Sequence, residues 1–148
     1  MTAAVQERFA AAQRGWRRAI DAHRLAPPDA GFSQRLADLA AAAREDALAC
    51  READAEGYEW QPHRGKGQPP AELQPGSGRR GPEGVWQRFD AAVAALNRAS
   101  TGKSLTEVAA AYELLSELAA ELAAAVEQED RKSGLLPPAK RRLRASAS

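Results

Sequence analysis

The chain has 148 residues, which suits one domain with flexible segments attached, and its formal net charge of +1 favours no class of partner. Its single cysteine, Cys50, excludes an internal disulfide and fits a reducing, cytoplasmic location. No uncharged apolar run approaches the about 18 residues of a membrane-spanning helix. The early charges at Glu7, Arg8 and Arg14 are unlike a secretory signal. We therefore expect a cytoplasmic protein that does not contact a membrane.

The first predicted helix runs from Thr2 to about Leu25. Its apolar side chains recur at spacings of three and four, so they share one face: Val5, Phe9, Ala12, Trp16, Ile20 and His23. The proline pair that follows ends this helix, because the residue before a proline is pushed out of the α region. We expect His23 at the edge of the apolar face, since the sequence offers no cluster with zinc-ligand spacing.

A second helix is predicted from near Ser33, a favourable N-cap, to about Glu56. Phe32 is placed to pack on its first turn as a hydrophobic staple. The apolar face consists mainly of small side chains: Leu36, Leu39, Ala40, Ala43, Ala47 and Cys50. Cys50 on this face is expected to be a small buried hydrophobe. The short link between the two helices predicts an antiparallel helical hairpin over residues 1–56.

Residues 57–83 change character, since six glycines and five prolines exclude a regular element there. A loop of this length is usually functional or disordered. Tyr58 and Trp60 are expected to tether its start to the helices. A third helix is predicted to begin at about Pro82 as its first residue. Its apolar stripe comprises Trp86, Phe89, Val93 and Leu96. A turn over residues 97–103 would then lead into a fourth helix, making residues 84–132 a second hairpin.

The fourth predicted helix, residues 104–130, is the longest. Ser104 and Glu107 form a capping box at its start, and Gly134 is placed to end it. Its apolar positions alternate spacings of three and four over about three heptads. Four of them make the seam through which we expect this helix to bind a protein partner or a second copy: Val108, Leu115, Leu118 and Leu122.

The acidic side of this helix also points to a partner. Glu113, Glu117 and Glu121 follow one another at i, i+4 spacing, and residues 104–130 contain no Lys or Arg. Each such like-charge pair costs a few tenths of a kcal/mol. Arginines brought by a partner would relieve that repulsion.

Charge changes sign after this helix. Residues 104–130 carry seven acidic side chains, whereas residues 131–148 carry six basic and no acidic ones. The tail, residues 133–148, is rich in Pro and Arg and is predicted to be disordered unless bound. Its basic cluster is the candidate contact for nucleic-acid phosphates: Lys140, Arg141, Arg142 and Arg144. Four loop bases near Trp60 could extend that surface, although a flexible linker is the favoured interpretation of this loop: Arg64, Lys66, Arg79 and Arg80.

Signatures of catalysis are lacking in the sequence. Gly102, Lys103 and Ser104 match the end of a phosphate-binding P-loop, but Asn97 stands where the motif needs glycine and a helix precedes it. Neither a nucleophile elbow nor a zinc-protease motif is present. We predict that the chain is no enzyme and uses no cofactor or metal, and the sequence identifies no small-molecule ligand.

These patterns predict an all-α protein of two antiparallel helical hairpins, joined by the Gly/Pro loop 57–83 and followed by the basic tail 133–148. The hairpins either form a four-helix bundle or stay apart and pair with another chain. The favoured function is a non-enzymatic interaction or assembly module acting through helix 104–130. The alternative is a small accessory or regulatory protein that binds nucleic acid through the tail and the loop.

Overall fold

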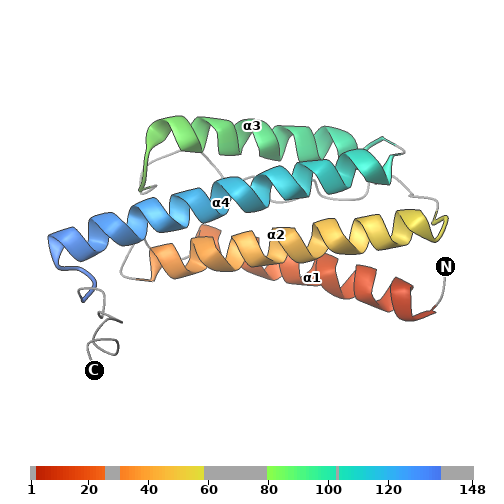
Figure 1. The fold of residues 1–148 in the computed structure, drawn as a ribbon, viewed down its shortest axis with the longest axis horizontal. Coiled ribbons are helices and arrows are strands. Elements are labelled where there is room, and N and C mark those ends of the chain that lie inside the picture. The colour runs from red at the N-terminus through yellow and green to blue at the C-terminus, as the bar shows by residue number, and fades with distance from the viewer. Residues whose placement is uncertain (1–2, 26–30, 59–79, 103, 138–148) are drawn as a thin grey trace, which may run out of the picture.

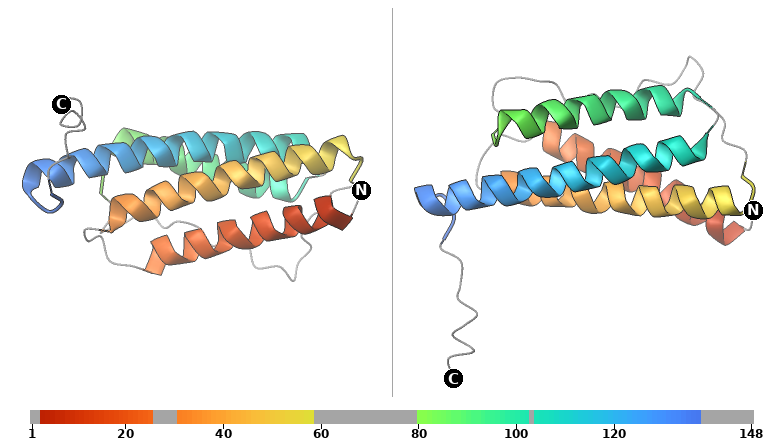
Figure 2. Two further views of the ribbon diagram at one scale, coloured as in Figure 1. Left: turned by 60° about the horizontal axis from the view of Figure 1, so that its bottom comes forward. Right: turned by 45° about the horizontal axis from the view of Figure 1, so that its top comes forward.

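The computed structural model describes residues 3–25, 31–58, 80–102 and 104–137 (Figure 1). This part of the chain contains four helices and no strand: α1 Ala3–Leu25, α2 Phe32–Ala55, α3 Glu83–Ser100 and α4 Leu105–Ser133. They form two antiparallel hairpins packed into one bundle, which confirms the predicted fold class (Figures 1 and 2). None of the four helices combines the length and apolarity that crossing a bilayer requires.

The α2 and α4 helices form the central pair of the bundle, with α1 beside α2 and α3 beside α4 (Figure 1). Both central helices bury alanines, which lets their backbones approach closely: Ala43, Ala47, Ala53, Ala109 and Ala119. The Ser116 hydroxyl of α4 donates to the Ala40 carbonyl of α2 at 2.8 Å. The many alanines make the sequence look poor in core residues, but they allow α2 and α4 to pack closely at the centre of the bundle.

The few bulky side chains connect the outer helices to the rest of the core. Trp16 of α1 meets Tyr112 of α4 edge-on, with ring centroids 5.4 Å apart. His23, which is 7% exposed, lies 5.1 Å from the Phe32 ring and 6.0 Å from the Trp86 ring of α3. His23 is thus on the α1 face that its spacing predicts, but it is buried there and does not lie at the edge of that face as expected. Aromatic side chains fill the wider spaces that alanines leave open.

Buried polar contacts fasten the chain where it enters α3. The Arg80 guanidinium forms an ion pair with Asp130, which is 2% exposed near the end of α4. The Trp86 indole N–H donates to the Arg80 carbonyl at 2.9 Å, and the guanidinium lies 5.4 Å above the Phe32 ring. The charge of Arg80 is thus neutralised within the chain, which removes it from the basic surface that the loop bases could form.

The ends of α4 follow the predicted caps. The Glu107 backbone N–H donates to Ser104 Oγ at 3.3 Å, and Gly134 ends the helix with a φ of 85°. Only glycine adopts that left-handed conformation without strain. Tyr58 also contacts the bundle as predicted, with its ring 5.4 Å from that of Phe9.

Three other helix boundaries differ from those predicted. Gly31, not Ser33, is the N-cap of α2, and no side chain caps that end; Ser33 is buried in the first turn. Pro82 is the N-cap of α3 rather than its first residue, and its carbonyl accepts from Trp86 N–H at 3.1 Å. The α3 helix continues to Ser100, through the residues expected to turn. The starts of α2 and α3 differ from the prediction by one or two residues, which is the usual variation at helix ends.

Candidate interaction surface

The predicted seam of α4 lies inside this chain. All four of its residues are at most 3% exposed: Val108, Leu115, Leu118 and Leu122. They belong to the core that α4 shares with its neighbours α2 and α3. A partner could reach them only if the helices separated. A heptad pattern marks a face that packs on helices, but it does not say whether those helices are the chain's own.

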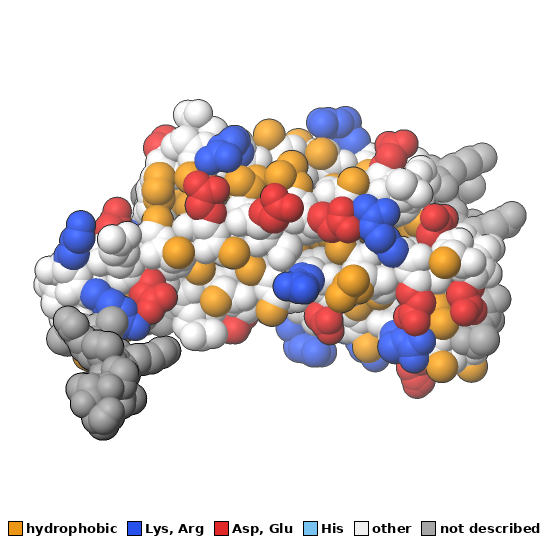
Figure 3. All heavy atoms as spheres, viewed as in Figure 1, with side chains coloured by type: hydrophobic (Ala, Val, Ile, Leu, Met, Phe, Trp, Pro, Cys, Tyr) orange, Lys and Arg blue, Asp and Glu red, His pale blue; other side chains and the backbone are white. Residues whose placement is uncertain are grey.

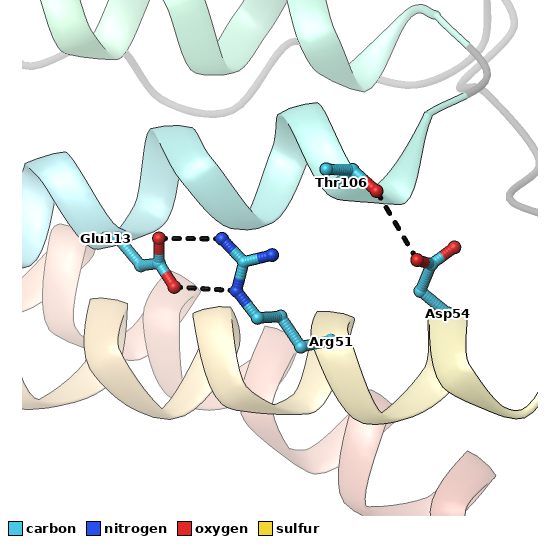
Figure 4. Close-up of polar contacts among 4 residues, drawn as sticks. All are labelled: Arg51, Asp54, Thr106 and Glu113. Carbon is cyan, nitrogen blue, oxygen red and sulfur yellow. Dashed lines mark hydrogen bonds and ion pairs between the residues drawn. The ribbon is translucent and has the colours of Figure 1, made fainter.

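Two glutamates on the acidic side of α4, Glu113 and Glu121, are likewise matched within the chain. Arg51 of α2 donates two hydrogen bonds to the Glu113 carboxylate, at 2.7 and 2.8 Å (Figure 4). These bonds and the charge of Arg51 lower the pKa of Glu113. Arg88 of α3 lies 3.4 Å from Glu121. The arginines expected from a partner therefore come from α2 and α3. Figure 3 shows the resulting mixture of acidic and basic side chains over this side.

The outer side of the α1–α2 hairpin carries a groove of about 570 Å³. Its walls are small side chains from both helices: Ala11, Ala12, Gly15, Ala42 and Ala49. A Cβ built on Gly15 would meet nothing within 4 Å. The left view of Figure 2 brings these two helices forward. Walls of this kind leave room for a bulky side chain or for the ridge of another helix.

Leu48 stands on the α2 side of this groove with 57% of its surface exposed. Arg8 and Glu52 face each other across the groove and join through two hydrogen bonds, at 2.9 and 2.6 Å. These bonds and the Arg8 charge lower the pKa of Glu52. Glu45 also lines the α2 side and is exposed. The α1 side is basic and the α2 side is acidic.

We call this surface the outer α1–α2 face. It comprises the small groove walls together with five larger side chains: Arg8, Arg18, Glu45, Leu48 and Glu52. Arg18 is included because it is exposed and lies one turn beyond Gly15 on the same side of α1. The apolar walls and their charged rims suit helix packing.

A polar cluster lies inside the bundle. Asp46 of α2 is fully buried, and neither carboxylate oxygen has a hydrogen bond of ordinary geometry. Burial raises the pKa of Asp46 to about 7, opposed in part by its interaction with the Tyr112 hydroxyl. Burial and the nearby Asp46 charge raise the pKa of Cys50 to about 12. Such a thiol is protonated at neutral pH, so Cys50 is the small buried hydrophobe predicted and not an activated nucleophile.

The predicted nucleic-acid contacts fall outside the described residues: Lys140, Arg141, Arg142 and Arg144. Their role stays a prediction, as do those of Trp60 and the remaining loop bases. Within the described ranges, no three His, Cys, Asp or Glu side chains are grouped to hold a metal ion.

Sequence reasoning missed the outer α1–α2 face. Two signals were available. Gly15 interrupts the middle of a helix, where glycine costs roughly 0.5–1 kcal/mol relative to alanine. Leu48 lies off the apolar stripe of its own helix, beside charged residues. Neither signal is decisive alone, because the groove exists only where α1 and α2 bring their small residues together.

Comparison of this chain with protein-family models, with curated proteins and with solved structures found no match. The function is therefore inferred from the residues and contacts described above.

Proposed function

We propose that this chain is a non-enzymatic helical interaction module that docks a helix on its outer α1–α2 face. One observation carries the proposal: Leu48 is 57% exposed beside a groove of about 570 Å³ with small apolar walls. The proposal keeps the predicted class of function and moves the partner surface from the α4 seam to this face, because the seam lies in the core.

The driving force would be the burial of apolar surface. Fully burying a leucine side chain contributes about 1.5–3 kcal/mol relative to leaving it exposed. Leu48 retains more than half of its surface in the isolated chain, so much of that energy is still available to a partner. Ala11 and Gly15 add area and allow backbones to approach to the roughly 8–10 Å typical of packed helices.

The charged groups on this face suit the recognition of a partner better than the catalysis of a reaction. Arg8 is exposed and Glu52 is half-buried, and the two neutralise each other, while Glu45 stands apart on the rim. The groups with strongly shifted pKa values, Asp46 and Cys50, lie in the core and not on the groove. A docking surface with a charged rim uses such groups to choose the orientation of its partner.

Cysteine accessibility tests this function without knowing the partner. Ala11→Cys places a thiol on the groove wall, and Ala110→Cys places a matched thiol on the exposed side of α4. The native Cys50 is buried and should not be labelled. Both new thiols should react with a maleimide at similar rates in the dilute purified chain. In extract of cells that produce the chain, Ala11→Cys alone should be protected. Equal labelling of both thiols in extract would overturn the proposal.

A further inference from the structure

We infer that the partner on the outer α1–α2 face is a second copy of this chain, related by a twofold axis parallel to the helices. The inference rests on the proposed function and adds the identity and the orientation of the partner. The inference is based on the self-complementarity of this face, which carries both a projecting group and the hollow that could receive it. An exposed leucine stands beside a hollow, and a basic helix lies beside an acidic one.

The charges select the orientation. Arg8 and Glu52 pair within the chain, so the charges left for a partner on this face are those of the exposed Arg18 of α1 and the exposed Glu45 of α2. A twofold axis running across the helices would lay α1 on the α1 of the second copy and bring arginine against arginine. An axis parallel to the helices lays α1 on α2 of the second copy instead. Basic and acidic side chains then face each other twice, once on each side of the axis.

The register of the α1–α2 hairpin places Leu48 opposite the hollow of the second copy in this arrangement. Arg8 and Glu52 pair within one chain, and α1 and α2 are antiparallel. Moving one residue forward along α1 therefore corresponds to moving one residue backward along α2, so Ala12 and Leu48 lie at the same height along the helix axis. A twofold axis parallel to the helices does not change the height of any residue. Leu48 of each copy then enters the hollow of the other copy beside Ala12, and the absent side chain of Gly15 leaves room one turn away.

The same register brings Arg18 of one copy within a turn of Glu45 of the other. Within the described part of a single chain, neither residue forms an ion pair. Both are exposed, so each can be reversed in charge without disturbing the core. This pair can therefore be tested separately from the folding of the chain.

The experiment is sedimentation velocity on the full chain over a concentration series, with Arg18→Glu, Glu45→Arg and their equimolar mixture. Each variant alone would place like charges in contact twice, and its dimerisation should weaken by about tenfold or more. In the mixture, a dimer of one variant with the other has opposite charges at both contacts between the copies. This mixed dimer should therefore form about as tightly as the dimer of the original chain. Glu117→Arg, at an exposed position on α4, should change nothing.

A chain that stays monomeric up to about 1 mM would overturn the second copy as partner. If Ala11→Cys were still protected in extract, the docking function would stand with another protein as the occupant. A dimer whose mixture of variants is no tighter than either variant alone would overturn the twofold arrangement. Restored association in the mixture, with both single variants weakened, is the result expected.

Discussion

Arg80 and Asp130 lie 50 positions apart in the sequence and form an ion pair whose carboxylate is almost wholly buried. The contact ties the segment that enters α3 to the end of α4. Removing one member of a buried ion pair leaves the other charge uncompensated in the interior.

Asp130→Asn should therefore lower the free energy of unfolding by about 3–5 kcal/mol, the range typical of a broken buried pair. Urea denaturation followed by circular dichroism measures this. Glu127→Gln is the matched control, because it breaks the partly exposed i, i+4 pair with Arg131 on the same helix and should cost less than about 1 kcal/mol. Equal effects of the two substitutions would show that the Arg80 contact is not formed.

The buried carboxyl of Asp46 makes stability depend on pH. Its pKa is about 7 in the folded chain, against a usual value of 3.8. Between these values the folded state holds a proton that the unfolded chain releases, so stability falls as pH rises from about 4 to 7. At 1.36 kcal/mol for each unit of pKa shift, the loss amounts to about 4 kcal/mol at most. Stability should be greatest on the acidic side of this window.

Asp46→Asn removes this titration while keeping the side-chain shape. Urea midpoints measured from pH 4 to 8 should be flatter for the variant, and above pH 7 it should be the more stable protein. Asp38→Asn, at an exposed position on the same helix, should keep the slope of the original chain. A slope that survives Asp46→Asn would assign the pH dependence to another group.

Replacing Gly15 or Gly134 by alanine should have opposite effects on the stability of the chain. A Cβ at Gly15 has open space around it in the middle of α1, so Gly15→Ala should stabilise the chain by about 0.5–1 kcal/mol. Gly134 has a φ of 85°, which strains any other residue, so Gly134→Ala should destabilise by about 1 kcal/mol. Thermal melts of the two variants, at a concentration too low for association, provide the comparison. Destabilisation by Gly15→Ala would mean that the groove wall is closed.

The tail provides an independent prediction from the sequence. If Lys140, Arg141, Arg142 and Arg144 contact phosphates, removing residues 139–148 should weaken nucleic-acid binding and flatten its dependence on salt. Gel shifts with and without these residues, over a salt series, measure both effects. Unchanged affinity and slope would remove the nucleic-acid alternative.

Periodicity along the chain predicts the helices and their pairing into hairpins, because a buried face repeats every three to four residues whatever it packs on. It predicts the α4 seam for the same reason. What lies against that seam depends on contacts between distant segments, such as Arg51 with Glu113, 62 positions apart. The sequence shows the unpaired glutamates of α4 but not the arginines of the same chain that neutralise them.

The outer α1–α2 face illustrates a second limit. Small residues are read from a sequence as core, and about half of the alanines of α2 and α4 are indeed buried. Those on the groove walls are small for a different reason, since Ala11 is exposed and Gly15 has open space beside it. Telling the two cases apart requires the rotation of α1 relative to α2, which is set by packing and not by local pattern.

The central claim is that Leu48 is a docking residue, and one comparison tests it most directly. Leu48→Asp and Leu114→Asp put the same charge at two exposed leucines, 57% and 46% accessible, on different helices. Sedimentation velocity at high concentration should show that Leu48→Asp is a folded monomer, while Leu114→Asp associates as the original chain does. Association that survives Leu48→Asp unchanged, or is lost equally in both variants, would contradict the account.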